Sequence, residues 1–166
     1  MRVRPTLLAL AFSSSLAIAQ TIPEAHCTSL AGTTVNLPAD LQGRTTILVL
    51  GFSRDSQQSV TTWGRRLAAD FATSTTVSFY ELAMLESVPR IMRGLVLRSM
   101  KKDVSERNQP HLLPITDNEP LWRNLAHYDK PEDAYVLLVA PDGAILWQAA
   151  GPPTDAAYAD LRKHLP

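Results

Sequence analysis

Two nearly continuous apolar runs dominate the hydrophobic pattern of this chain. They are residues 45–52 (TTILVLGF) and 134–140 (AYVLLVA). A strand with one wet face alternates apolar and polar residues, whereas a strand covered on both faces reads as an unbroken apolar run. Each run therefore predicts a central strand of a sheet that is covered on both sides.

Weaker strand signals surround these two runs. Residues 77–82 alternate in polarity, and residues 32–38 alternate until Pro38, which suggests a short edge strand. Residues 115–117 read as the end of another edge strand. Pro141, Asp142 and Gly143 are strong turn formers, so residues 144–149 are predicted to pair antiparallel with 134–140 as a hairpin.

Helical spacing predicts four helices. Val60, Trp63, Leu67 and Phe71 recur at this spacing and place a helix over about 56–72. A second helix is expected over 88–102, a short one over 120–126 with Asp117 or Asn118 as its cap, and a last one that begins after Thr154.

The 88–102 helix is predicted to have two different faces. Its expected buried stripe consists of Val88, Ile91, Met92, Leu95 and Ser99. Its opposite face carries five cations, Arg90, Arg93, Arg98, Lys101 and Lys102. A solvated surface is one interpretation of such a face, and contact with anionic lipid headgroups or an acidic partner is the other.

The order of the elements predicts an α/β fold. A strand–helix–strand unit that is followed by a hairpin and a terminal helix gives a central mixed β-sheet with helices on both faces. The 166 residues suit a single domain. The three tryptophans, Trp63, Trp122 and Trp147, occupy apolar-spaced positions and are expected in the core, and Met84, Met92 and Met100 are expected to fill packing gaps.

The N-terminus reads as an export signal. Arg2 and Arg4 precede an uncharged run over 6–18, and the small residues Ala17 and Ala19 allow cleavage before residue 20. The predicted organisation is a signal peptide over 1–19, a flexible leader over 20–31 and one domain over 32–166. The mature protein would then be periplasmic or secreted. An uncleaved anchor and a mitochondrial presequence are the alternatives.

Cysteine content restricts the chemistry more than any other feature. Cys27 is the single cysteine, so no intramolecular disulfide can form. The formal net charge of zero argues against nucleic-acid binding, which usually needs a basic excess. The four histidines show no metal-ligand spacing, and the chain carries no phosphate loop or nucleophile elbow. The sequence therefore predicts no metal and no cofactor.

The predicted order of elements resembles the thioredoxin-like superfamily, and several local motifs resemble the mitochondrial ATP synthase assembly factor family within it. The motifs are GTTVNLP at 32–38, Gly51-Phe52-Ser53, the helix with Trp63, Tyr80-Glu81-Leu82, Met92-Arg93-Gly94, and Asp142-Gly143 followed by Ile145, Trp147 and Gly151. This resemblance implies a chaperone-like, non-enzymatic role in assembling a membrane complex such as ATP synthase, through a protein partner.

The superfamily's redox members carry Cys-x-x-Cys at the turn between the first central strand and its helix. Here that turn reads Ser53, Arg54, Asp55 and Ser56. Thiol exchange needs an attacking thiolate and a second, resolving thiol, so we expect no catalytic residue in this degenerate active-site loop. Ser53, Asp55 and Ser56 are the candidate caps of the helix, and Arg54 at a helix N-terminus makes an anion site conceivable.

Two functional hypotheses follow. The first is a redox-inactive, exported binding or assembly factor whose interaction surface combines the Ser53–Ser56 loop with the basic helix. The alternative is a thiol oxidoreductase or peroxidase-like enzyme that uses Cys27 with an external thiol.

Overall fold

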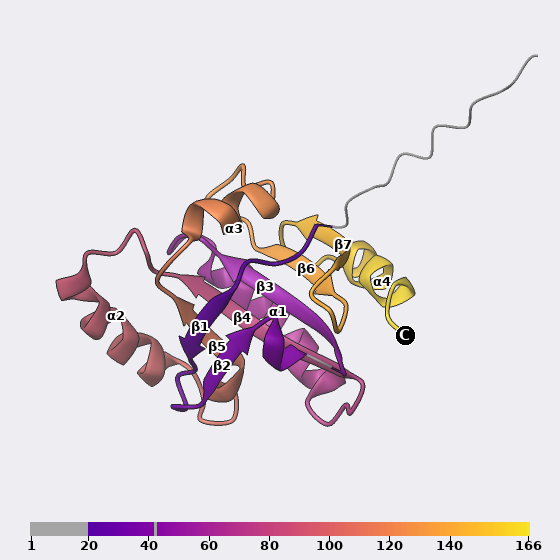
Figure 1. The fold of residues 1–166 in the computed structure, drawn as a ribbon, viewed down its shortest axis with the longest axis horizontal. Coiled ribbons are helices and arrows are strands. Elements are labelled where there is room, and N and C mark those ends of the chain that lie inside the picture. Colours follow the sequence, from indigo (N-terminus) through magenta and orange to yellow (C-terminus); the bar gives the residue numbers. More distant parts are fainter. Residues whose placement is uncertain (1–19, 42) are drawn as a thin grey trace, which may run out of the picture.

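The computed structural model describes residues 20–41 and 43–166. The predicted signal peptide, 1–19, lies outside the described residues. A five-stranded mixed sheet forms the centre of the protein, in the order β5-β4-β3-β6-β7 (Figure 1). Its strands are β3 (Thr45–Gly51), β4 (Val77–Met84), β5 (Leu112–Ile115), β6 (Tyr135–Val139) and β7 (Ile145–Ala150). The predicted α/β class is therefore confirmed.

The two apolar runs form the middle of this sheet, as predicted. Strands β3 and β6 pair antiparallel, with Leu48 opposite Leu137, and all five residues of β6 are buried. Strands β4 and β5 continue from β3 in parallel, while β7 closes the predicted hairpin beyond β6. Gly143 adopts a φ of 88° in the hairpin turn, a conformation that glycine reaches without steric penalty.

Helices α1 (Gln57–Phe71) and α4 (Asp155–Lys163) cover one face of the sheet. Trp63 and Leu67 of α1 pack against Ile47 and Val49 of β3. The Trp63 Nε1 donates a hydrogen bond to the Gly151 carbonyl at 2.9 Å, which ties α1 to the chain after β7. Thr154 caps α4 as predicted, since its hydroxyl accepts a hydrogen bond from the Ala157 amide.

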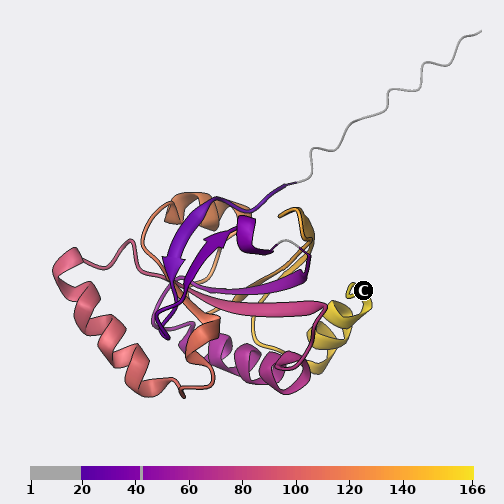
Figure 2. The same cartoon turned by 60° about the horizontal axis from the view of Figure 1, so that its bottom comes forward.

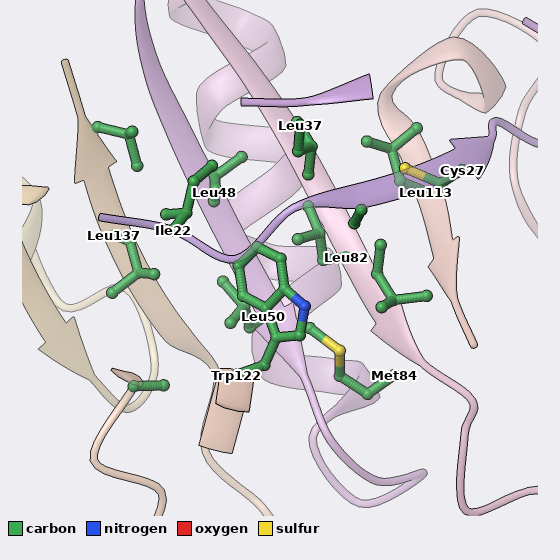
Figure 3. Packing of buried hydrophobic residues seen from close by; sticks show 14 of the residues in the cluster. Ile22, Cys27, Leu37, Leu48, Leu50, Leu82, Met84, Leu113, Trp122 and Leu137 are labelled. Carbon is green, nitrogen blue, oxygen red and sulfur yellow. The ribbon is translucent and has the colours of Figure 1, made fainter. Parts of the chain in front are cut away.

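The opposite face is covered by α3 (Glu119–Leu125) and by a small hairpin, β1 (Ala25–Thr28) and β2 (Thr34–Leu37). Figure 3 shows Trp122 of α3 lying across Leu50 and Leu82, with Cys27 beside Leu113. A single-turn 3₁₀ helix, η1 (Ala39–Leu41), follows β2, and a second, η2 (Gln109–His111), precedes β5. Helices therefore lie on both faces, as predicted.

The prediction of a flexible leader over 20–31 is wrong. Strand β1 lies inside it, pairs antiparallel with β2, and buries Ala25 and Cys27 on alternate positions. Ile22 is buried as well, and Thr21 bridges to Ala144 beside β7. The inward-facing residues of β1 are small, so the strand has a weak hydrophobic signal although each of its four residues pairs with β2.

Helix α2 (Arg90–Asp103) forms where a helix was predicted, but it faces the other way. None of its fourteen residues, all of which the structure describes, is buried. It stands away from the sheet and from the other helices (Figures 1 and 2). Ile91, Met92 and Leu95, predicted to be buried, are exposed, and the half-buried side consists of Arg93, Val96, Leu97 and Met100.

The other packing and capping predictions have mixed outcomes. Trp63, Trp122 and Met84 are in the core as expected, but Trp147 is only partly buried. Asn118 is the residue before α3, as predicted, yet its side chain makes no capping hydrogen bond. The Glu86 carboxylate accepts a hydrogen bond from the Glu119 amide in its place, at 2.5 Å. No helix in the described part of the chain is long and apolar enough to cross a bilayer.

Candidate functional site

The Ser53–Ser56 turn lies between the end of β3 and the start of α1, at the carboxyl end of a parallel strand. This is the position where open α/β sheets usually place their functional residues. Buried strand β3 fixes one side of the turn, and α1 fixes the other. Arg54 and Asp55 are exposed at its tip, whereas Ser56 is fully buried.

The two serine hydroxyls of this turn are held by backbone groups. The Ser53 hydroxyl donates to the Pro131 carbonyl at 2.6 Å and accepts hydrogen bonds from the amides of Asp55 and Ser56. The Ser56 hydroxyl donates to the Ser53 carbonyl at 2.9 Å. A serine nucleophile needs a general base within hydrogen-bond reach. Among the described residues, neither hydroxyl has an imidazole or carboxylate partner.

Of the three candidate caps of α1, only Ser53 accepts hydrogen bonds from amides at this end of the helix. Ser56 is the residue before the helix, but its side chain makes no capping hydrogen bond, and no hydrogen bond of the Asp55 side chain is found among the described residues. The Ser53 hydroxyl, four residues before the helix start at Gln57, accepts from the amides of Asp55 and Ser56. The Ser56 hydroxyl donates to the Ser53 carbonyl and therefore does not cap the helix.

A loop ahead of β6 closes over the turn. The Ser59 hydroxyl donates to the Glu132 carbonyl, next to the bond between Ser53 and Pro131. Tyr135 holds this loop from below, since its buried hydroxyl accepts from the amides of Asp129 and Lys130 and donates to the Lys130 carbonyl. The turn and the loop therefore form one hydrogen-bonded edge of the molecule.

An aromatic and charged cluster lies beside this edge, and sequence analysis missed it. The Arg123 guanidinium lies 4.0 Å from the ring centre of Tyr128 and 5.0 Å from that of Phe52. It also donates to Glu119 Oε1 at 2.9 and 2.6 Å. The spacing of Glu119 and Arg123 by four residues was a visible signal for the ion pair. The contact with Phe52 joins distant segments, so no local pattern could have revealed it.

Cys27 lies elsewhere, in β1, among the buried side chains on the face of the sheet that α3 covers (Figure 3). Its side chain is 6% exposed, and its thiol donates a hydrogen bond to the Val35 carbonyl at 3.2 Å. Burial, together with the smaller effect of the nearby carboxylates of Asp117 and Asp40, raises the pKa of this thiol to about 11. At neutral pH the sulfur is therefore a protonated, sheltered thiol and not a thiolate nucleophile.

Four of the five predicted cations of α2 are on the surface. Arg90, Arg98, Lys101 and Lys102 are exposed, and within residues 20–41 and 43–166 none of them has a carboxylate within ion-pair distance. Arg93 differs, because its guanidinium donates to the carbonyls of Val88 and Glu86 at 2.9 Å and closes the N-terminal turn of the helix. The predicted basic face therefore has four members and not five.

Helix α2 projects away from the sheet (Figures 1 and 2), and none of the described hydrogen bonds of the Ser53–Ser56 turn reaches it. A search of the described residues finds no group of three or more histidine, cysteine or acidic side chains arranged to hold a metal ion. Among the described contacts, no general base lies within hydrogen-bond distance of the Cys27 thiol or of the Ser53 and Ser56 hydroxyls.

Comparison with solved structures identifies the fold. The chain is similar to the exposed lipoprotein thioredoxin Etrx1 from Streptococcus pneumoniae, with a TM-score of 0.60, 11% identity, and coverage of 86% of this chain and 100% of that one. It is similar to the thioredoxin domain of a thiol-disulfide oxidoreductase from Bacteroides vulgatus, with a TM-score of 0.60, 15% identity and coverage of 92% and 100%.

A third similar structure is BsSco, a member of the Sco family of cytochrome c oxidase assembly proteins. Its TM-score is 0.52 at 14% identity, with coverage of 89% of this chain and 94% of that chain. Identities this low establish the thioredoxin-like fold and nothing about activity. No curated protein matches the chain.

The family follows from a separate comparison. The model of the ATP10 protein family matches residues 15–165, nearly the whole chain. Together with the thioredoxin-like fold and the Ser53–Ser56 turn that stands where redox members carry two cysteines, this match confirms the resemblance that the sequence motifs indicated. The chain belongs to the ATP10 protein family of thioredoxin-like assembly factors.

Proposed function

We propose that this protein is a redox-inactive, exported assembly factor that binds a membrane-protein subunit, with ATP synthase as the complex it serves. The observation that carries the proposal is that neither the thiol of Cys27 nor the hydroxyls of Ser53 and Ser56 are available as nucleophiles. Cys27 is sheltered in β1 with its pKa raised to about 11, and the Ser53 and Ser56 hydroxyls are tied to backbone carbonyls. A thioredoxin-like surface without exchange chemistry is left with binding.

The Ser53–Ser56 turn is our proposed client contact. Arg54 and Asp55 are exposed at its tip, next to the ordered loop that Tyr135 supports. A rigid edge loses little conformational entropy when a partner docks, which favours recognition. The basic helix α2 is the second proposed interaction element. The membership in the ATP10 protein family supports this assignment, as does the shared fold of BsSco, a member of a family of cytochrome c oxidase assembly proteins.

Export after cleavage before Gln20 remains our proposed route, and a mitochondrial destination is its alternative. Structures similar to this chain include exported thioredoxins, whereas the family resemblance implies mitochondria. Sequencing the N-terminus of the mature protein tests the cleavage. A mature chain that begins at Met1 would contradict it.

The function is tested by restoring ATP synthase assembly in cells that lack this gene, measured as intact complex on native gels. We expect Cys27→Ser to restore assembly as well as the unaltered chain, because a serine hydroxyl can also donate to the Val35 carbonyl. We expect the charge reversal Arg54→Glu with Asp55→Arg to reduce assembly several-fold. Both side chains are exposed, so folding should be kept.

The matched control reverses two exposed charges elsewhere, Arg65→Glu with Glu106→Arg, and should leave assembly intact. Insulin reduction by the purified protein, with and without Cys27→Ser, checks the enzymatic alternative. Turnover that depends on Cys27 would replace the binding role with a one-thiol oxidoreductase. Equal assembly by the turn variant and its control would remove the Ser53–Ser56 turn as the client contact.

A further inference from the structure

Helix α2 exposes an unusual concentration of aliphatic side chains. Five large apolar side chains are exposed among the described residues, and three of them lie on this one helix. Ile91 is 90% exposed, Leu95 61% and Met92 45%. Ile91 and Leu95 are one turn apart and Met92 lies next to them, so the three occupy one side of the helix. Exposed apolar groups that are gathered in this way mark a contact surface.

Cations continue the same side of the helix. Positions 91, 95, 98 and 102 are separated by four, three and four residues, which places Ile91, Leu95, Arg98 and Lys102 on one line along α2. This line is apolar near the start of the helix and basic near its end. Arg90 and Lys101 lie to one side of it and are also exposed. The basic groups have no ion-pair partner in the described part of the chain.

The composition of this face fits a lipid surface better than a protein one. Energetically dominant residues of protein interfaces are enriched in tryptophan and tyrosine and fill pockets, and α2 carries no aromatic side chain. Interfacial helices place aliphatic side chains at the boundary between headgroups and acyl chains, with lysine and arginine beside the phosphates. The helix also stands clear of the sheet, so its outer side can meet a flat surface (Figures 1 and 2).

We propose that α2 attaches the protein to the surface of an anionic phospholipid bilayer. Ile91, Met92 and Leu95 enter the interfacial region, and Arg98, Lys101 and Lys102 contact headgroup phosphates. Charge complementarity selects the occupant, because four cations with no ion-pair partner among residues 20–41 and 43–166 lie on α2 before and beyond the apolar residues. The inference rests on the proposed function and extends it, since it names the membrane surface to which the assembly factor binds when it meets its client.

Flotation of the purified full chain with vesicles tests this. The vesicles are phosphatidylcholine alone or phosphatidylcholine mixed with phosphatidylglycerol, at low and at high salt. We expect binding to the anionic vesicles that weakens with salt. The variant R98Q/K101Q/K102Q should bind them about a hundredfold more weakly, because each cation near an anionic surface contributes about fivefold.

Two controls match the variants in charge and polarity. The triple R44Q/R65Q/K130Q removes three exposed cations outside α2 and should bind like the unaltered chain. I91S/L95S should lose about tenfold or more, whereas L121S/L146S, which changes the two exposed leucines elsewhere, should not. Circular dichroism verifies that each variant is folded. All variants carry the same N-terminal segment, so a difference between a variant and its control reports on the residues that were changed.

Equal binding by R98Q/K101Q/K102Q and its control would overturn the inference, as would equal binding to neutral and anionic vesicles. Binding to a polyglutamate resin that depends on α2, without vesicle binding, would assign the helix to an acidic protein instead. The vesicles contain no client, and the turn variant at Arg54 and Asp55 leaves α2 unchanged. Loss of vesicle binding and loss of assembly are therefore separable failures.

Discussion

Helices α1 and α2 are similar in sequence pattern and opposite in environment. They contain 15 and 14 residues, each follows a parallel strand of the sheet, and both are amphipathic. Helix α1 buries Trp63, Gly64 and Leu67, whereas α2 buries none of its residues. Hydrophobic periodicity thus predicted both helices correctly, but it did not distinguish a stripe that packs on the sheet from one that faces outward.

Topology accounts for the difference. The crossover through α1 joins β3 to β4 in the middle of the sheet, so the helix lies over a wide apolar surface. The crossover through α2 joins β4 to the edge strand β5, and the helix projects beyond that edge (Figure 1). A helix at the rim has little surface to cover, and its stability then depends on local features such as the hydrogen bonds that Arg93 donates to Val88 and Glu86.

The largest expected difference between the two helices is in the free energy of unfolding that is lost when a large side chain is truncated. Trp63→Ala should lower the free energy of unfolding by about 3–5 kcal/mol, since it leaves a large cavity and removes the hydrogen bond to Gly151. Leu95→Ala in α2 should change it by no more than about 0.5 kcal/mol. Denaturant unfolding measures both. A loss of comparable size at Leu95 would mean that the outer side of α2 is covered in the folded chain.

The contact between α1 and the sheet should make the stability of the protein depend on pH, through Glu81 of β4. Its carboxyl lies against Gly64 of α1, and burial raises its pKa to about 7 from the ordinary 4.5. The folded state therefore binds this proton more tightly than the unfolded state. The resulting stability is fully present below about pH 4.5 and is lost as pH rises to about 7, by at most about 3 kcal/mol.

The variant Glu81→Gln should remove this part of the pH dependence, so that its stability relative to the unaltered chain improves from pH 4.5 to 8. Chemical unfolding across this range measures it. The control is Glu106→Gln, which changes an exposed carboxylate just after α2 and should keep the pH dependence of the unaltered chain. Parallel stability curves for the unaltered chain and Glu81→Gln would contradict the buried carboxyl.

The smallest expected effects on stability come from the same substitution, glycine to alanine, made once in each helix. A Cβ atom at Gly64 of α1 would meet the Glu81 carboxyl, whereas one at Gly94 of α2 would meet nothing within 4 Å. Gly64→Ala should therefore destabilise the protein by about 1–3 kcal/mol, and Gly94→Ala should stabilise it by about 0.5–1 kcal/mol through helix propensity. Thermal unfolding under identical conditions resolves the two signs. Destabilisation by Gly94→Ala would mean that another part of the folded protein packs against α2 at this position.

The central sheet was predictable because the sequence of its strands is compatible with few other positions in the fold. The runs at 45–52 and 134–140 are too apolar for an edge, and Asp142-Gly143 fixes the hairpin. Strand β1 was not predictable in the same way, because its buried residues, Ala25 and Cys27, are small and the strand is only four residues long. Its stability comes from pairing with β2 and from packing on the sheet.

The candidate site was predictable in position but not in its contacts. The strand-to-helix junction located the Ser53–Ser56 turn, since such junctions are readable from the apolar run that precedes them. The partner of Ser53 is the Pro131 carbonyl, 78 residues away. The cluster of Arg123, Tyr128 and Phe52 likewise joins segments that only the folded chain brings together.

The burial of Cys27 has a consequence for where this protein can work. If the proposed redox-inactive role holds, a polypeptide with one thiol, held under the sheet and donating to Val35, should keep the same covalent structure in a glutathione-rich cytosol and in an oxidising envelope. Its shape would then be independent of the ambient reduction potential. We therefore expect it to remain one covalent species beside partners whose own sulfurs exchange.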